Sequence, residues 1–295
     1  MSNNRMNIAV SVNNSFVMPL KIMLYSLAQN TSKDLHIYLL YTQDLSNKNR
    51  KILHHFITKY RIGTLYEILI DRSLFQEFED PKSMFSLECY YRLLLPYVLE
   101  PSVDKIFWLD ADVVVCGNMD EFYDADIAQY YLIATCYPEA GDIEQRKLHK
   151  QRLNIPQEQK YFNAGVLVFN LPAIRKSFSQ QQILDFCIQN KEKLTYLDQD
   201  VLNYNMGHNT LFFNEFIYNN QEHLKDKITE DARLIHYTTF QKPWKVFYQG
   251  NEFATTCFWK YACGCGFRKK YIFFLIGNKI CRYIYPIYLK LRYKK

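Results

Sequence analysis

The sequence predicts an α/β protein with a mostly parallel sheet, and three observations support this fold class. The chain has 295 residues, 48% hydrophobic and 22% charged, a globular composition long enough for one large domain. In the first half, short β-branched segments alternate with longer segments of helical periodicity, as in βαβ units. No stretch approaches the roughly 20 uninterrupted apolar residues of a membrane-spanning helix.

The first elements can be assigned from hydrophobic spacing. A strand is expected over residues 7–12, a helix over 18–29 and a second strand over 35–41. The next helix, over residues 46–60, opens with a serine in a capping position. A third strand is expected over residues 64–70.

The later elements are less regular. We expect a helix over residues 84–99 and a strand over 105–109 that ends at Asp110. A strand over residues 165–170 and a long helix over 172–191 follow. In open α/β sheets, ligands bind beyond the carboxyl ends of the strands, so residues at strand ends are the first candidates for a site.

The charge distribution divides the chain at residue 267. The net charge is +6, but residues 267–295 contain nine Lys and Arg residues and no acidic residue, which leaves about −3 for residues 1–266. Basic residues gathered in a tail, and not spread over a folded face, argue against a nucleic-acid-binding protein. We therefore expect one domain over residues 1–266 and a basic, aromatic-rich tail over residues 267–295.

Two acidic residues interrupt the apolar segment 107–115. Asp110 and Asp112 lie at the end of an expected buried strand. In an extended backbone, side chains at i and i+2 point to the same face, with Cα atoms about 6.5–7 Å apart. Two unpaired carboxylates would repel each other there, so a bound cation is one interpretation and an ordinary strand-end cap is the other.

Three later segments add polar groups. Asn163 and Gly165 precede an expected buried strand, where the backbone can approach a ligand closely. Residues 197–203 place acids and an amide at the start of a short helix, where acids also occur as ordinary caps. His236 precedes Lys242 by six residues, and a histidine considered alone is more often structural than a ligand.

Taken together and in this order, these four segments resemble glycosyltransferase family 8, which includes glycogenin and the bacterial lipopolysaccharide and lipooligosaccharide hexosyltransferases. The resemblance extends from Asn7 to Trp244. It implies a GT-A fold, which is a Rossmann-like single domain, a UDP-sugar donor and retention of the anomeric configuration. It also implies that Asp110, Asp112 and His236 are metal ligands, normally for Mn²⁺.

The resemblance further assigns residues to the donor site. Lys242 matches a lysine that contacts the donor diphosphate, and Arg92 matches an arginine beside the donor sugar. Residues 11–16 match the loop that holds uridine, with Phe16 as a stacking ring. Asp198 and Gln199 are the catalytic candidates. The remaining residues that the resemblance places against the donor are Val12, Asn13, Ala111, Asn163, Ala164 and Thr239.

Two positions depart from the family pattern. Asn13 and Asn14 stand where bacterial members commonly have acids, and an amide oxygen there can still accept from the uracil N3–H. Thr239 stands where glycine is usual. Its side chain either narrows the diphosphate site or donates a hydrogen bond to it.

The expected chemistry follows from charge. When a sugar–diphosphate bond breaks, negative charge develops on the leaving UDP, and a divalent cation together with Lys242 would stabilise it. Two carboxylates and one imidazole suit Mn²⁺ better than an all-oxygen site would, with Mg²⁺ as the alternative. The hexose is expected to be galactose or glucose. The reaction either forms a covalent intermediate on Asp198 or Gln199 or follows a front-face route.

The tail predicts where the protein acts. It alternates cations with aromatic side chains, a composition that suits the surface of an anionic membrane, with a solvated or partner-bound tail as the alternative. We therefore expect a cytoplasmic enzyme on the inner face of the cytoplasmic membrane. Its acceptor would be a glycan or glycolipid, in the first place the lipopolysaccharide or lipooligosaccharide outer core, and no nucleic acid would bind.

Other functions remain as alternatives. The acceptor could be a protein or another surface glycan. Nucleotidyl transfer also uses paired aspartates, but it normally shows a glycine-rich phosphate loop near the first strand, and residues 7–20 contain no glycine. A catalytically silent carbohydrate- or membrane-binding protein would have no need of a metal triad beside Lys242.

Overall fold

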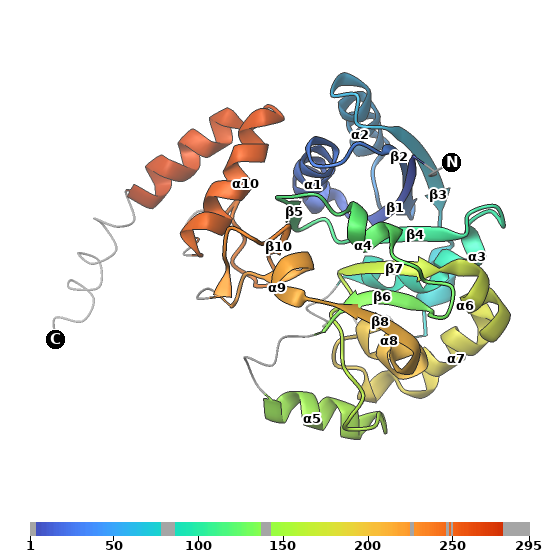
Figure 1. Ribbon diagram of the computed structural model, residues 1–295. Helices are drawn as coiled ribbons and strands as arrows, with labels where there is room; N and C mark the ends of the chain where they lie inside the picture. Colours follow the sequence, from blue (N-terminus) through green and yellow to red (C-terminus); the bar gives the residue numbers. More distant parts are fainter. Residues whose placement is uncertain are drawn as a thin grey trace, which may run out of the picture.

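A seven-stranded sheet runs through the molecule. The computed structural model describes residues 4–77, 86–136, 143–224, 227–245, 248 and 250–279, and Figure 1 shows their arrangement. In spatial order the strands are β3 (Thr64–Leu69), β2 (Asp34–Tyr41), β1 (Arg5–Ser11), β4 (Lys105–Leu109), β7 (Val166–Asn170), β6 (Leu132–Thr135) and β8 (Thr210–Phe213). Strand β7 is antiparallel to β4 and β6, and the other neighbours are parallel. The predicted fold class, α/β with a mostly parallel central sheet, is confirmed.

Helices cover both faces of this sheet. Along β4, Phe107 and Leu109 belong to one buried cluster, and Ile106 and Trp108 belong to the other. This alternation follows from the two-residue period of a strand, and a sheet with mainly parallel strands buries both faces. The first cluster includes side chains of α1 (Val17–Gln29), α2 (Asn47–Lys59) and α10 (Glu252–Gly264), and the second includes those of α6 (Leu171–Ser177), α7 (Gln180–Gln189) and α8 (Asp198–Met206).

Helix α2 begins where the sequence predicts. The hydroxyl of Ser46 accepts a hydrogen bond from the backbone N–H of Asn49 at 3.3 Å, which satisfies a donor that the first turn leaves free. The helix then buries Leu53, Phe56 and Ile57 on one face. Local capping and hydrophobic spacing therefore agree on this element.

Two predicted helices differ in the structure. Residues 84–99 were expected to form one helix, but a 3-10 helix (Leu87–Leu94) precedes the short α3 (Leu95–Val98), because Pro96 lacks the N–H that a continuous α-helix would use there. Residues 172–191 were expected to form one long helix, but they divide into α6 and α7. The Ser179 hydroxyl accepts from the Gln182 N–H at 3.2 Å and the Gln182 side chain accepts from the Ser179 N–H at 2.8 Å, so a reciprocal capping box starts a new helix.

A second, three-stranded sheet was not predicted from the sequence. It consists of β5 (Val113–Val115), β10 (Leu234–His236) and β9 (Asn220–Gln221). Strand β10 runs antiparallel to β5, with His236 opposite Val113, and the Tyr237 N–H donates to the Asp112 carbonyl at 3.0 Å. This sheet brings residues far along the chain back to the loop that follows β4.

Four short 3-10 helices and the helices α4 (Asp120–Asp124), α5 (Ile143–Arg152) and α9 (Glu215–Tyr218) complete the described part of the chain up to residue 245. The 3-10 helices are Asn14–Phe16, Arg72–Phe75, Lys191–Lys193 and Gly207–Asn209.

Part of the predicted tail packs on the domain. Residues 268–279 are helical, and Tyr271 and Phe274 lie against Trp259 with ring centroids 5.2 Å and 4.9 Å apart. Residues 280–295 lie outside the described residues, and the predicted boundary at residue 267 stays a prediction. Within the described parts of the chain, no helix has the length and apolar character needed to cross a bilayer.

Candidate active site and metal-ligand cluster

Asp110 and Asp112 lie in the short connection between the two sheets. Strand β4 ends at Leu109 and β5 begins at Val113, so the two acids belong to a turn and not to extended backbone. The two acids lie close together, as expected. The cause is the turn between the strands and not the two-residue period of an extended strand. The indole N–H of Trp108 donates to Asp110 Oδ1 at 2.9 Å and fixes that carboxylate.

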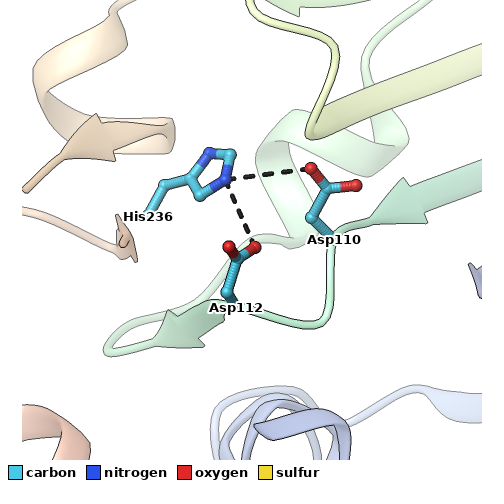
Figure 2. A group of neighbouring side chains, drawn as sticks. All are labelled: Asp110, Asp112 and His236. Carbon is cyan, nitrogen blue, oxygen red and sulfur yellow. Dashed lines mark ion pairs between the residues drawn. The ribbon is translucent and has the colours of Figure 1, made fainter. Parts of the chain in front are cut away.

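His236 completes a compact group with these two acids. Its Nε2 lies 3.8 Å from Asp110 Oδ2 and 3.5 Å from Asp112 Oδ1 (Figure 2). One ligand atom from each of the three residues falls within 4.8 Å of the other two. Two carboxylates and an imidazole in this arrangement fit a divalent cation of borderline softness.

A buried amide orients the imidazole. His236 Nδ1 lies 3.0 Å from Asn219 Oδ1, and Asn219 has no solvent-exposed surface. Because the amide oxygen can only accept, Nδ1 is the donor, and Nε2 faces the two carboxylates. Hydrogen bonding of the distal ring nitrogen is the usual way in which a metal-binding histidine is oriented. Asn219 was not predicted, because nothing near it in the sequence points to the turn after β4.

Glycine at position 165 leaves room for the cluster. A Cβ atom built there would lie 2.3 Å from His236 Cε1 and 2.7 Å from Asp110 Oδ2, closer than real contacts allow. The Gly165 carbonyl also accepts from the Asp110 N–H at 2.9 Å. The close approach that the sequence suggested at this glycine therefore involves two of the predicted metal ligands.

Arg92 joins the cluster to the start of α8. The side chain is only 4% exposed, and it forms ion pairs of 3.0 Å with Asp110 Oδ1 and 2.9 Å with Asp198 Oδ2. Its guanidinium lies 4.6 Å from the Trp108 ring centroid and donates to the Ala164 carbonyl. The Arg92 guanidinium therefore pairs with two acidic side chains at once.

Asp198 is a buried acid, and an ordinary helix cap does not describe it. Burial raises the pKa of Asp198 to about 7; the nearby Asp110 carboxylate acts in the same direction, and the Arg92 guanidinium acts against both. The residue before it, Leu197, has φ 48° and ψ −119°, a conformation that costs energy for a residue with a Cβ.

Gln199 and Asn163 extend the polar network. Gln199 Oε1 accepts from the Ala164 N–H at 3.0 Å and from Asn163 Nδ2 at 3.2 Å. Asn163 Oδ1 in turn accepts from the Gly165 N–H at 3.0 Å and from Asn219 Nδ2 at 3.1 Å. A continuous chain of hydrogen bonds thus connects α8 with the residue that orients His236.

Lys242 lies beside the second acid. Its ammonium donates to Asp112 Oδ2 at 2.7 Å and also to the Tyr237 carbonyl. Burial would raise the pKa of Asp112, but the Lys242 ammonium and the His236 imidazole hold that pKa well below its ordinary value. Asp112 is therefore a carboxylate at neutral pH, as a metal ligand must be.

The Thr239 hydroxyl forms hydrogen bonds within the protein. Its hydroxyl lies 3.0 Å from Glu222 Oε2 and 2.8 Å from the Gln241 carbonyl. In this arrangement the hydroxyl stays paired with neighbouring groups and does not project as a free donor.

The predicted uridine loop lies at the same edge of the sheet, because β1 and β4 are parallel neighbours and the loop follows β1. Val12 is buried, and the Asn13 side chain accepts from the Ser15 N–H at 3.0 Å. Phe16 lies edge-on to Trp244 with centroids 5.9 Å apart. Ala111, the remaining predicted donor-site residue, lies between the two acids and is 7% exposed.

Comparisons with curated proteins find bacterial glycosyltransferases. The chain is 26% identical over 198 residues to a Haemophilus influenzae glycosyltransferase; the match covers 67% of this chain and 58% of that protein, less than two thirds of its length. It is 25% identical to a lipopolysaccharide 1,2-glucosyltransferase of Escherichia coli and 24% identical to a lipopolysaccharide 1,3-galactosyltransferase of Salmonella typhimurium. Each of these two matches covers 81% of this chain and 73% of the relative.

Solved structures support the fold. The crystal structure of the galactosyltransferase LgtC with donor and acceptor sugar analogs superposes with a TM-score of 0.76 at 21% identity, covering 90% of this chain and all of that one. This likeness confirms the predicted GT-A fold.

The sequence profile of glycosyl transferase family 8 matches residues 7–247. The chain, with the polar cluster at the end of its central strand, therefore belongs to glycosyl transferase family 8.

Proposed function

We propose that this protein transfers a hexose, galactose or glucose, from a UDP-sugar to a glycan acceptor in a metal-dependent reaction. The observation that carries the proposal is the convergence of Asp110, Asp112 and His236, with Lys242 in contact with the second acid. Relatives named as lipopolysaccharide glucosyl- and galactosyltransferases support the choice of hexose.

The donor set supports Mn²⁺ as the ion, with Mg²⁺ as the alternative, because one of the three ligands is an imidazole. A divalent cation held by these residues would neutralise charge on the leaving diphosphate. Lys242 now pairs with Asp112 at 2.7 Å. A cation held by Asp112 would share the charge of that carboxylate, and the Lys242 ammonium would then be available to donate to the diphosphate.

The sugar is proposed to lie against the network of Arg92, Asn163, Ala164, Asp198 and Gln199. Asp198 and Gln199 are only 4% and 7% exposed, and they are held by Arg92 and by the Ala164 N–H. Such restraint favours residues that position the sugar over residues that attack its anomeric carbon. We therefore favour the front-face route, in which the acceptor hydroxyl enters beside the departing phosphate and the configuration is retained.

The proposed acceptor is the outer core of lipopolysaccharide or lipooligosaccharide, since several relatives are named for lipopolysaccharide synthesis. A protein or another surface glycan remains the alternative. We further propose that the enzyme acts as a peripheral protein on the inner face of the cytoplasmic membrane, through the basic tail of residues 267–295. The tail's nine cations and its lack of acids support this location.

Calorimetric titration with UDP-galactose and UDP-glucose, with and without Mn²⁺, tests the donor and the metal together. Asp112→Asn should weaken Mn²⁺-dependent binding at least tenfold, because it removes one of two carboxylate ligands. Asp231→Asn, a change at an exposed acid, is the matched control and should bind like the unaltered chain. Binding that is unaffected by Mn²⁺ or by Asp112→Asn would exclude the proposed metal site, and a silent binding protein would become the better description.

A further inference from the structure

A groove of about 680 Å³ lies outside the candidate active site. It is formed by α1, α2 and the turn that follows α10, three segments that lie close together in Figure 1. None of the residues assigned above to the donor site lines it. Its walls include the aromatic side chains Phe56, Tyr60 and Phe267.

Positive charge is concentrated in this groove. Lys48, Lys51 and Lys59 lie along one face of α2 at helical spacing, with His55 between Lys51 and Lys59, and Lys21 of α1 adds a fourth lysine. None of the described residues that line the groove is acidic. Among the ion pairs of the described chain, none involves these lysines.

Lys21 is partly buried in this groove, between two aromatic rings. Its ammonium lies 4.6 Å from the Phe56 ring centroid and 4.8 Å from that of Phe267. Burial lowers the pKa of Lys21, and the neighbouring Lys59 and Lys270 lower it further. The rings offset part of this cost, but a group of like charges in a partly buried groove is best satisfied by an anion.

The helix of residues 268–279 continues directly from the wall of the groove. Tyr271 and Phe274 face inward against Trp259, whereas four apolar side chains on this helix are exposed. They are Ile272 (49%), Phe273 (71%), Leu275 (48%) and Ile276 (50%). An exposed apolar face flanked by Arg268, Lys269 and Lys270 is typical of a helix that lies in a membrane interface.

We infer that this groove binds the phosphate headgroup of an anionic phospholipid while the helix of residues 268–279 lies in the interface beside it. Charge complementarity selects a phosphate, and the neighbouring exposed apolar side chains select a lipid over a free phosphate ion. The inference rests on the proposed membrane location. It adds a specific lipid-binding site, formed by folded residues of α1, α2 and the turn after α10. It does not depend on the transferase activity.

Vesicle co-sedimentation of the full chain tests the groove. The double variant Lys51→Gln/Lys59→Gln removes two exposed cations from it. The control Lys176→Gln/Lys193→Gln removes the same charge from exposed positions that do not line the groove. With phosphatidylcholine vesicles containing phosphatidylglycerol, we expect the groove variant to bind about 25-fold more weakly than the unaltered chain, from the contribution of two cations near an anionic surface.

The control variant should lose little of this binding, and pure phosphatidylcholine vesicles should bind all three proteins weakly. Equal losses in the groove and control variants would overturn the inference, because they would indicate net charge alone. So would binding without preference for phosphatidylglycerol.

UDP-sugar hydrolysis in solution, measured on the same samples, separates this inference from the proposed function. Absent hydrolysis and absent Mn²⁺-dependent UDP-sugar binding, together with groove-dependent vesicle binding, would refute only the transferase. Normal hydrolysis together with groove-independent vesicle binding would refute only the lipid site.

Discussion

At the scale of single residues, the candidate site places several acidic side chains next to few cations. Arg92 is shared between Asp110 and Asp198, and Lys242 pairs with Asp112, so three acidic side chains and a histidine gather around two permanent cations. Neutral partners position two of these side chains: Trp108 bonds to Asp110, and Asn219 bonds to His236. A divalent cation bound between Asp110 and Asp112 would offset the mutual repulsion of these two carboxylates.

Gly165→Ala should damage the cluster without a change of charge. The new methyl group would meet His236 Cε1 and Asp110 Oδ2 at 2.3 Å and 2.7 Å, so both side chains must move. We expect the Mn²⁺ affinity, measured by calorimetry, to fall by about 10- to 100-fold, as it does when groups that orient metal ligands are disturbed.

Gly117→Ala is a suitable control for this substitution. The added methyl would contact Arg233 Cγ at 3.2 Å, a side chain that can shift away from it. Mn²⁺ binding should be retained there. If Gly165→Ala also retains full affinity, the ligand positions described above do not represent the metal-binding state.

At the scale of elements, local capping residues determine where a helix begins, even where the hydrophobic pattern continues without a break. The apolar pattern continues from α6 into α7, yet the capping box of Ser179 and Gln182 divides the two helices. Strand β4 ends before the acidic turn, as the sequence predicts, and the short strand β5 that follows this turn was not predicted.

Ser179→Ala should lower the free energy of unfolding by about 1 kcal/mol, because the Gln182 N–H loses its acceptor at the start of α7. Urea unfolding followed by circular dichroism measures this change. Gln182→Ala removes the reciprocal bond, and the double variant should cost less than the sum of the single variants, because each bond supports the other. Strictly additive losses would show that the two bonds act independently.

At the scale of the whole molecule, the Arg92 network ties the stability of the fold to pH. Arg92 comes from the 3-10 helix Leu87–Leu94, Asp110 from the turn after β4 and Asp198 from α8. Because the pKa of Asp198 is raised to about 7 from an ordinary value of 3.8, the folded state holds a proton that the unfolded state has released at intermediate pH.

Unfolding releases this proton, so the folded protein should become less stable as the pH rises toward 7. Between pH 5 and pH 7, Asp198 should decrease the free energy of unfolding by up to about 1.4 kcal/mol per pH unit. Asp198→Asn, which cannot ionise, should lose this decrease. Urea unfolding of both proteins across this range isolates the contribution, and parallel pH profiles would mean that Asp198 is already ionised in the folded protein.

Several parts of this protein could be predicted from the sequence because they depend on neighbours in the chain. The alternation around β1 to β3, the Ser46 cap and the place of Asp110 at the end of β4 follow from spacing and capping chemistry. The pairing of Asp110 with Asp112 was also foreseeable, but the expected extended geometry was wrong, because the intervening backbone turns.

Only the tertiary structure decided which distant groups meet. The three-stranded sheet places His236 against the acidic turn, and the antiparallel return of β7 brings Gly165 beneath it. Asn219 and the pairing of Arg92 with Asp198 depend on the same contacts. A sequence states which side chains are available and how each short segment folds. Which of them share a buried site depends on strand order and packing, and those arise from interactions between segments far apart in the chain.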